Sequence, residues 1–369
     1  MATTGIVDCD THFWEPIELW DEYIEPEFRA SAPHLVHDGD RLLMQVGQSV
    51  YPSAPNHRGL GATYGPRETL KEQVIWDREV SCDAQRRLEF MDRTGADVHI
   101  VFPTLGMVGF SSIDDPAVAA ACARAYNRFC RDFASADPRR LRPVMLLPMN
   151  HPDVAIEEMR YAREECGLSV AFANPTPPDD IAWGNGRYDD LWDAFEDLDV
   201  TLAFHESAVG ATDNTIGLQR YAGYHGMAYL TAHTVEPQLA VMDVLLGGVV
   251  ARHPKLKAGL LEAHLAWLPG WLEMVDHVTE RYPQGWDHDQ KPSEMFRQHF
   301  FVAAFPDDIG VGAAAESLPD GNVVFSSDWP HKSLTEQRTS LDEFEQRPDL
   351  APAAQKRILE ENPRLWFDL

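Results

Sequence analysis

Short apolar segments alternate with longer amphipathic stretches along most of the chain, and this pattern predicts strands and helices in turn. Eight apolar segments are predicted as strands: residues 6–10, 96–103, 142–148, 169–173, 200–205, 257–262, 300–304 and 323–326. Helical patterns separate most of them, and the pairs Asp137-Pro138 and His253-Pro254 end two of these helices. Strands that alternate with helices over this length are typical of a parallel α/β architecture.

Among α/β folds, the eight repeats favour the (β/α)8 TIM barrel over an open doubly wound sheet. An open sheet would place a glycine-rich dinucleotide turn after the first strand, and the sequence DCDTH at that point contains no glycine. Residues 26–76 and 281–298 do not fit the repeat, and residues 41–52 have the pattern of a hairpin. We therefore predict one barrel domain over residues 1–369, with both insertions covering its C-terminal mouth.

Composition and charge narrow the range of partners. The chain of 369 residues has 31 Lys+Arg against 59 Asp+Glu, a formal net charge of −28. This charge argues against binding to nucleic acid or to an anionic membrane, because phosphate groups would be repelled. With 44% hydrophobic residues, the chain has enough apolar material for a large core.

The cysteines and the N-terminus point to the cytoplasm. Five cysteines without a C-x-x-C pair do not form a disulfide framework, so a reducing compartment is expected. The first residues show no basic and apolar run of the signal-peptide kind. No uninterrupted apolar stretch approaches the roughly 18 residues of a membrane span. We expect a soluble cytoplasmic protein.

Side chains that bind metals follow four of the predicted strands. They are Asp10 and His12 after the first strand, His205 after the fifth, Glu262 and His264 after the sixth, and Asp328 and His331 after the eighth. Each one alone has an ordinary structural explanation, such as a helix cap for Asp328 or an interior histidine for His205. The carboxyl ends of barrel strands meet at one mouth, however, and several such groups converging from different strands predict a metal site there.

Aromatic and histidine residues next to these ligand positions are candidates for substrate contact. They are Phe13, Trp14, His233, Trp267, Trp329 and His331. Core packing under the loops explains Trp14 and Trp267 equally well. A substrate in contact with these side chains would have an apolar or aromatic body. An anionic group on that substrate would need a positively charged side chain as its anchor. The candidates for that anchor are Arg58, Arg187, Arg220 and Lys332.

Several motifs resemble the amidohydrolase-2 family, the branch of the amidohydrolase superfamily with aminocarboxymuconate semialdehyde decarboxylase and the resorcylate decarboxylases. The matching segments are DCDTHFWEP (residues 8–16), FHES around His205, LEAHLAWLP (261–269), FSSDWPH (325–331) and the terminal ENPRLWFDL. They occur in the family's order and span almost the whole chain.

The resemblance implies roles for individual positions. His12 matches the second histidine of the family's H-x-H, and Asp10 stands where the first histidine is usual. His205 and Asp328 match the metal ligands after strands five and eight. His264 matches a histidine that acts as acid/base or ligand, although Leu265 and Ala266 replace the glycines that follow it in the family. His264 and Asp328 are therefore the expected catalytic residues, and Glu262 is a further candidate for the metal shell.

These residues are compatible with more than one reaction. A divalent ion (Zn, Mn or Fe) on Asp10, His12, His205 and Asp328 fits non-oxidative decarboxylation or hydrolysis of a small organic carboxylate or its ester. Adding Glu262 and His264 gives the donor set of a non-haem diiron monooxygenase that hydroxylates a hydrophobic carboxylate, so two ions are the alternative. A non-catalytic binding module ranks last, because the converging ligands would then have no purpose. The family resemblance also implies a homodimer acting on a small molecule.

Overall fold

Eight parallel strands form the centre of the molecule in the computed structural model. The structure describes residues 5–47, 49–51, 60–108, 110, 113–206, 216, 220–221, 224–284, 286, 288–331 and 337–369. The strands are β1 (Ile6–His12), β5 (Ala96–Phe102), β6 (Leu141–Pro143), β7 (Val170–Ala173), β8 (Thr201–His205), β9 (Ala258–Leu261), β10 (Phe300–Ala304) and β11 (Val323–Phe325). Each lies within or overlaps one of the eight apolar segments that predicted it.

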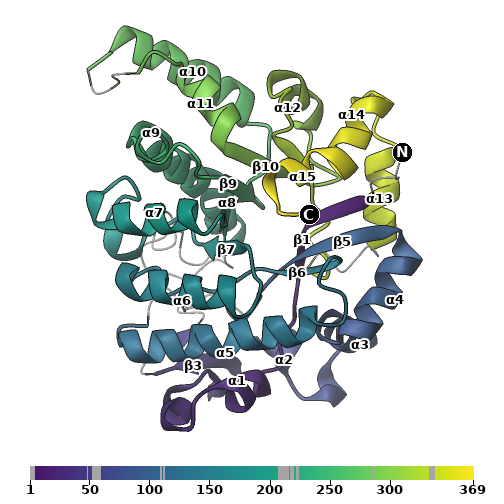
Figure 1. Cartoon of the computed structure of the whole chain (residues 1–369). Coiled ribbons are helices and arrows are strands. Elements are labelled where there is room, and N and C mark those ends of the chain that lie inside the picture. The colour runs from purple at the N-terminus through teal and green to yellow at the C-terminus, as the bar shows by residue number, and fades with distance from the viewer. Residues whose placement is uncertain are drawn as a thin grey trace.

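The strands close into a barrel. One sheet has the order β1-β5-β6 and a second has the order β11-β10-β9-β8-β7, with parallel pairing throughout. A parallel bridge between Met145 and Ala171 connects the β6 edge to β7. A second bridge, between Thr11 and Trp329, connects the segment after β11 back to β1. The predicted TIM barrel is therefore confirmed, and Figure 1 shows its strands surrounded by helices.

The helices of the outer layer begin and end at recognisable signals. The described helices that follow or precede the barrel strands are α4 (Ala84–Thr94), α5 (Pro116–Ala134), α6 (Pro152–Glu164), α7 (Asp189–Asp197), α8 (His225–Val241), α9 (Val249–Arg252), α10 (Leu268–Arg281), α11 (Pro292–His299), α12 (Val311–Ser317), α13 (Gln337–Glu345), α14 (Pro352–Lys356) and α15 (Pro363–Trp366). Asp115 caps α5 by accepting hydrogen bonds from two backbone N–H groups, and Pro116 fits the first helical position. Gly95 ends α4 at φ 93°, a conformation that favours glycine.

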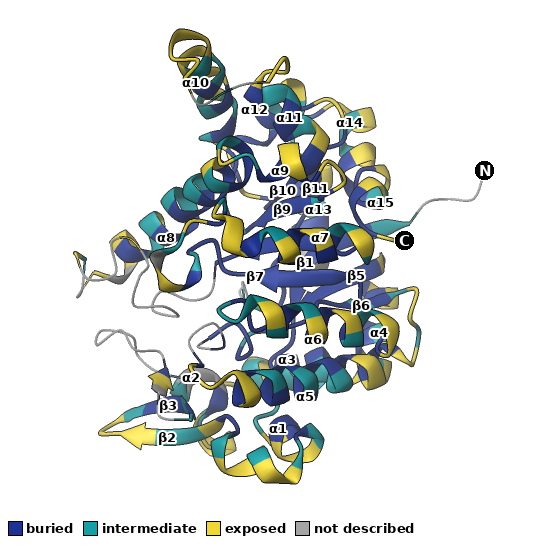
Figure 2. Ribbon diagram, turned by 60° about the vertical axis from the view of Figure 1, so that its left-hand side comes forward, coloured by how far each residue is buried: buried dark blue, intermediate teal, exposed yellow. Residues whose placement is uncertain are grey.

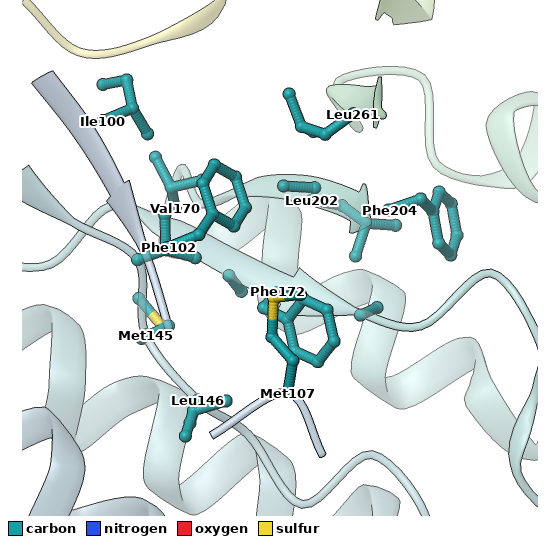
Figure 3. Packing of buried hydrophobic residues seen from close by; sticks show 14 of the residues in the cluster. Ile100, Phe102, Met107, Met145, Leu146, Val170, Phe172, Leu202, Phe204 and Leu261 are labelled. Atoms are coloured by element: carbon teal, nitrogen blue, oxygen red, sulfur yellow. The ribbon is translucent and has the colours of Figure 1, made fainter. Parts of the chain in front are cut away.

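Buried apolar side chains fill the space inside the barrel and between barrel and helices. Figure 3 shows this packing for Ile100 and Phe102 of β5, Phe172 of β7 and Phe204 of β8, together with Met145. Both faces of a parallel barrel strand are covered, which is why these strands are nearly continuous apolar runs in the sequence. Figure 2 shows the buried strands at the centre and the exposed residues on the outer faces of the helices.

The first insertion forms a small antiparallel sheet. Its strands are β2 (His34–Asp38), β3 (Arg41–Val46) and β4 (Ser49–Tyr51), followed by the short helices α2 (Gly61–Tyr64) and α3 (Glu72–Cys82); α1 (Glu18–Tyr23) precedes it. The predicted hairpin over residues 41–52 corresponds to β3 and β4, with Pro52 outside the described residues. In Figure 2 this sheet lies on the same side of the molecule as α8.

The second insertion lies at the other end of the barrel, so its predicted position over the C-terminal mouth is wrong. Helix α11 runs directly into β10. His299 Nδ1 is 2.9 Å from the Leu256 carbonyl oxygen, and Asn322 Nδ2 donates to the Arg297 carbonyl at 2.8 Å. Leu256 and Asn322 precede β9 and β11, so α11 contacts the amino-terminal ends of the strands. A polar, aromatic composition indicates an exposed segment but not which end of the barrel it covers.

One helical run is longer than the sequence pattern predicts. The predicted helix over residues 237–252 begins at His225 instead, and α8, a π-helical turn and α9 follow one another to Arg252. By length and composition, residues 226–252 meet the requirement for a membrane span, with mean hydropathy 1.4 and 44% of the best window buried. The run packs on the barrel: Val244, Leu245 and Val249 belong to the main core, and Asp243 accepts a hydrogen bond from the buried Trp183 backbone at 2.9 Å.

Candidate metal centre

Four of the predicted ligands converge at the carboxyl ends of β1, β8 and β11. His12 Nε2 lies 3.2 Å from Asp10 Oδ1 and 3.3 Å from Asp328 Oδ1, and His205 Nε2 lies 3.3 Å from Asp10 Oδ1. Donor atoms that share one ion at about 2.0–2.2 Å lie roughly 3.0–3.5 Å from one another. These three separations fall in that range, and His12 belongs to both groups of described residues at this mouth that could hold an ion, Asp10/His12/His205 and His12/Asp328/His331.

The local backbone explains why these side chains meet. Asp10 and His12 are two residues apart on β1, so both point to the same face. His205 is the last residue of β8. Asp328 follows β11 at φ 55°, and its backbone N–H donates to the Asp10 carbonyl oxygen at 2.9 Å. A left-handed backbone at a residue other than glycine costs about 1–3 kcal/mol and occurs mainly at functional sites.

The same four atoms are among the buried side-chain atoms that lack a hydrogen-bond partner in the described part of the chain. Asp10 Oδ1, His12 Nε2, His205 Nε2 and Asp328 Oδ1 have no hydrogen bond to any described residue. All four residues are at least 98% buried. A buried polar atom without a partner is costly, and a coordinated cation would satisfy such donors. The residues present therefore fit a divalent metal.

Neighbouring carbonyl groups orient both imidazoles toward the centre. His12 Nδ1 is 2.8 Å from the Pro103 carbonyl and His205 Nδ1 is 2.7 Å from the Glu206 carbonyl. A proton on Nδ1 leaves the Nε2 lone pair directed at the cluster, the usual arrangement of a metal-binding histidine. Two carboxylates and two neutral imidazoles give the donor set a charge of −2, which a divalent cation balances.

The electrostatics of the centre favour bound positive charge. Burial alone would raise the pKa of Asp10, but His205 and His12 outweigh it and lower this pKa. The pKa of Asp328 is also lowered, since His331 and His12 overcome the effect of burial. Burial lowers and the two carboxylates raise the pKa of His12, to about 10 in the absence of an ion. Both carboxylates are therefore ionised and ready to bind a cation.

His331 lies beside the centre rather than outside it. Its ring stacks on His12 with centroids 3.9 Å apart, and its Nδ1 is 3.1 Å from Asp328 Oδ1. Its Nε2 is 2.7 Å from Thr104 Oγ1. Thr104 in turn belongs to the loop after β5, whose backbone N–H groups donate to the Glu15 carboxylate at 2.9–3.2 Å. Through these contacts His331 orients the Asp328 carboxylate, and His331 also faces the mouth of the barrel.

Glu262 is not in the metal cluster of the described residues. Tyr229 donates to Glu262 Oε1 at 3.2 Å, and His233 Nδ1 lies 3.4 Å from Glu262 Oε2. Burial, together with Asp328 and Asp10, raises the pKa of Glu262 well above its usual value. The tyrosine and histidine rings stack with centroids 3.8 Å apart. Glu262 thus forms a separate polar group beside the centre, and its role as a ligand stays a prediction.

His264 is likewise outside the described metal cluster. Its Nδ1 is 2.7 Å from Asp308 Oδ1, and its side chain is 35% exposed. The second oxygen of Asp308 accepts the Phe305 backbone N–H at 3.2 Å, which fixes the carboxylate. An imidazole oriented by a carboxylate is an arrangement for proton transfer. The role of His264 as a ligand stays a prediction, and its contact with Asp308 also fits the predicted catalytic role.

Two of the predicted substrate contacts pack in the core instead. Phe13 is fully buried and contacts the rings of three residues of α5: Tyr126, Phe129 and Phe133. Trp329 is 4% exposed and stacks on Phe90 with centroids 4.4 Å apart. Their proximity in sequence to ligands did not indicate direction, because neighbouring residues at a strand end point to opposite faces.

The other predicted aromatic contacts lie nearer to the mouth. The Trp14 ring is 6.4 Å from His331 and also lines a cavity of about 270 Å³ with Arg67 and Arg78. The half-buried Trp267 donates to the Ala263 carbonyl at 2.9 Å and packs on Trp271. His233 is buried, and burial first of all lowers its pKa, to about 3, so its ring is neutral.

Some contributors to the site are absent from the sequence prediction. Asp308 follows β10, and the rule applied to the other strand ends would also have indicated it. Arg87 of α4 donates hydrogen bonds to the His12 carbonyl and to Thr11 Oγ1, and nothing in its sequence context marks it. Of the predicted anion anchors, Arg58 and Lys332 lie outside the described residues. Arg187 pairs with Asp179 at 3.9 Å, and Arg220 is exposed.

A closed (β/α)8 barrel with an Asp/His metal cluster at its C-terminal mouth defines a metal-dependent enzyme of the amidohydrolase type. The family model described as Amidohydrolase matches residues 7–369, so the chain belongs to this family. The resemblance drawn from the sequence motifs is thereby confirmed.

Known relatives share the family and the fold. Gamma-resorcylate decarboxylase from Polaromonas sp. (strain JS666 / ATCC BAA-500) is 24% identical over 286 residues, which cover 71% of this chain and 83% of the relative. The enzyme of the same name from Rhodococcus jostii (strain RHA1) is 25% identical over 263 residues, 67% of this chain and 77% of the relative.

Solved structures resemble the whole barrel. An amidohydrolase from Mycobacterium avium subsp. paratuberculosis K-10 has a TM-score of 0.80 at 17% identity and covers 99% of this chain and 98% of its own. The dihydroxybenzoic acid decarboxylase from Polaromonas sp. JS666, solved with manganese and 2-nitroresorcinol, has a TM-score of 0.71 at 20% identity, with 100% and 98% covered. At these identities the likeness establishes the fold. Neither the diiron monooxygenase nor the non-catalytic alternative gains support from these relatives.

Proposed function

We propose that this chain catalyses the non-oxidative decarboxylation of a small aromatic carboxylate at a single divalent metal ion. The observation that carries the proposal is the convergence of four unpartnered, buried donor atoms from Asp10, His12, His205 and Asp328. Decarboxylases of this kind are the named relatives, and hydrolysis of an ester is the competing reaction at the same residues.

The ion and the protein divide the work. A divalent ion bound by the four ligands would hold the substrate carboxylate and a neighbouring oxygen and withdraw electron density from the ring. Asp10 and Asp328 would supply the negative charge that retains the ion. Hydrogen bonds to backbone carbonyl groups would keep the imidazoles of His12 and His205 directed at it. Manganese is the metal we propose, because the relative solved with an inhibitor holds manganese and a mixed carboxylate/imidazole set suits it.

The proton for the ring carbon comes from His264 in this proposal. Protonation at the carbon that bears the carboxylate is followed by cleavage of the C–C bond, whose electron pair returns to the ring as CO2 departs. Asp308 holds His264 by its Nδ1, so Nε2 is the atom that gives the proton and is later reprotonated from solvent. Trp14, Trp267, His233 and His331 are the proposed neighbours of the substrate body.

The proposal extends to the assembly and location of the enzyme. Met274 and Val278 of α10 and Tyr282, which directly follows the helix, are exposed apolar residues at the spacing of successive helical turns, and this supports a homodimer. The five cysteines are free thiols, which supports the cytoplasm as its compartment.

The test is turnover of a panel of hydroxybenzoates, beginning with 2,6-dihydroxybenzoate. The manganese-loaded protein should release one CO2 per substrate and, in D2O, incorporate one deuterium at the vacated ring carbon. The reaction should proceed equally well without oxygen. Hydrolysis of aryl esters with no CO2 release from any carboxylate in the panel would overturn the proposal.

A further inference from the structure

A second group of metal-binding side chains lies in the outer helical layer, away from the centre described above. Asp193 and Glu196 are three residues apart on α7, so they share one face of that helix. His253 follows α9 and faces them. One potential ligand atom from each of these three residues lies within 4.8 Å of the other two.

His253 is the residue that makes this cluster unusual. Its side chain is only 5% exposed, and neither ring nitrogen makes a hydrogen bond to a described residue. Its Nδ1 lies 3.0 Å from Asp193 Oδ1, a separation typical of two donors on the same ion. A buried imidazole is thus directed at two carboxylates on the surface of the barrel. Together they provide part of a metal coordination shell, and its remaining positions are open to solvent.

The neighbouring charges leave the two carboxylates available. Arg252 pairs with Asp189 at 2.8 Å, and this carboxylate, 3.7 Å from His253 Nε2, is thereby neutralised. Glu196 accepts the Lys255 backbone N–H with Oε1, which fixes the side chain and leaves Oε2 outside that contact. Asp193 is 64% exposed, so water or an ion reaches it freely.

We propose that Asp193, Glu196 and His253 bind a second divalent ion, of which zinc is the preferred example, with water completing the shell. Imidazole nitrogen and carboxylate oxygen are both ligands that zinc accepts. Because His253 precedes β9, this site belongs to the amino-terminal side of the barrel, whereas the first centre lies at the carboxyl ends of the strands. The ion would link α7 to the segment between α9 and β9, and its role would be structural.

Zinc titration of the chelator-treated full chain tests the proposal, with bound metal counted against a chromophoric competitor. The wild-type protein should bind two equivalents per chain. Asp193→Asn and Glu196→Gln should lose one equivalent, or weaken it at least about tenfold, and should leave the other unchanged. Asp190→Asn changes the charge of the same helix by the same amount at an exposed position outside the cluster, and it should still bind two.

A further variant separates this site from the first centre. Asp10→Asn should remove the equivalent held at the barrel mouth and keep the one at α7. Zinc should also raise the melting temperature of Asp10→Asn but not that of the Asp10→Asn/Asp193→Asn double variant. One equivalent in the wild type, or two equivalents of unchanged affinity in Asp193→Asn, would show that Asp193 and His253 form only an ion pair.

Discussion

The guanidinium carbon of Arg87 lies 5.0 Å from the centre of the Trp329 ring, and Trp329 directly follows the proposed metal ligand Asp328. The same guanidinium donates to the His12 carbonyl and the Ser81 carbonyl, each at 2.9 Å, and to Thr11 Oγ1 at 2.6 Å. Burial lowers the pKa of Arg87 to about 9, so it remains charged at neutral pH. One side chain of α4 thus joins the end of β1 to the segment after β11.

Arg87→Met should therefore reduce metal affinity, although none of the four proposed ligands is substituted. Loss of the guanidinium leaves two buried carbonyls without their donor, at about 1–3 kcal/mol each, so the melting temperature should also fall. Arg87→Lys restores the charge but not the forked geometry and should recover only part of both properties. The measurements are metal content and thermal unfolding. Full metal affinity in a folded Arg87→Met protein would remove Arg87 as a positioning residue.

Removal of a ligand should abolish the mouth-bound metal. His205→Ala deletes one donor, and Asp328→Asn removes one of the two charges that retain the cation, so metal content at the mouth should fall by about one equivalent in each. Elemental analysis after gel filtration measures this. The matched control is His264→Asn, which keeps all four donors and should keep the ion. A His205→Ala protein with unchanged occupancy would contradict the ligand set.

His264→Asn should lower kcat by about 10²–10⁴-fold, which is the usual contribution of a general acid to the rate. The metal content should not change. Asp308→Asn should cause a smaller loss, because it disturbs the orientation of the imidazole but not its presence. Steady-state kinetics on a turned-over hydroxybenzoate give both values. Near-normal turnover of His264→Asn would exclude it as the proton donor.

Glu262→Gln should retain the metal, since Glu262 contacts Tyr229 and His233 rather than the four ligands. The amide keeps the size of the side chain and tests its chemistry alone. We expect a change in KM at constant metal content. Loss of the ion in this variant would return Glu262 to the ligand shell.

Stability should depend on His299 at mildly acidic pH. Burial lowers the pKa of His299 below 6.5 and outweighs the opposing effects of the Leu256 carbonyl and Glu196. The unfolded chain then binds the proton more readily, so the contribution of His299 is complete above pH 6.5 and is lost as the pH falls. The melting temperature of the wild type should fall more between pH 7 and pH 5 than that of His299→Gln. Parallel curves would contradict this.

The sequence predicted the barrel well because each strand is buried on both faces and is therefore an unbroken apolar run. It also indicated that Asp10, His12, His205 and Asp328 would lie close together, since the carboxyl ends of parallel strands share one mouth. It did not separate Glu262 and His264 from them. All six lie at or just after the carboxyl ends of strands, and Asp328, Glu262 and His264 share a left-handed backbone (φ 55°, 54° and 52°), so only the side-chain contacts in the folded protein separate them.

Other errors have the same physical origin. Phe13 lies next to His12 in the chain, but the alternation of a strand turns it into the core. The segment 281–298 has the composition of a surface insertion, and composition does not specify the end of the barrel. Arg87 remained unnoticed because its partners are backbone carbonyls and ring faces, which leave no pattern in the sequence.

The bridge between Thr11 and Trp329 closes the barrel beside the ligands, and this has a consequence for biogenesis. During synthesis, Asp10 and His12 emerge from the ribosome long before Asp328, so the ion cannot find its full set of donors until β11 has joined β1. Metal loading would then be a late event that reports completion of the ring. A chain arrested before β11 should remain unmetallated however well its earlier helices have formed.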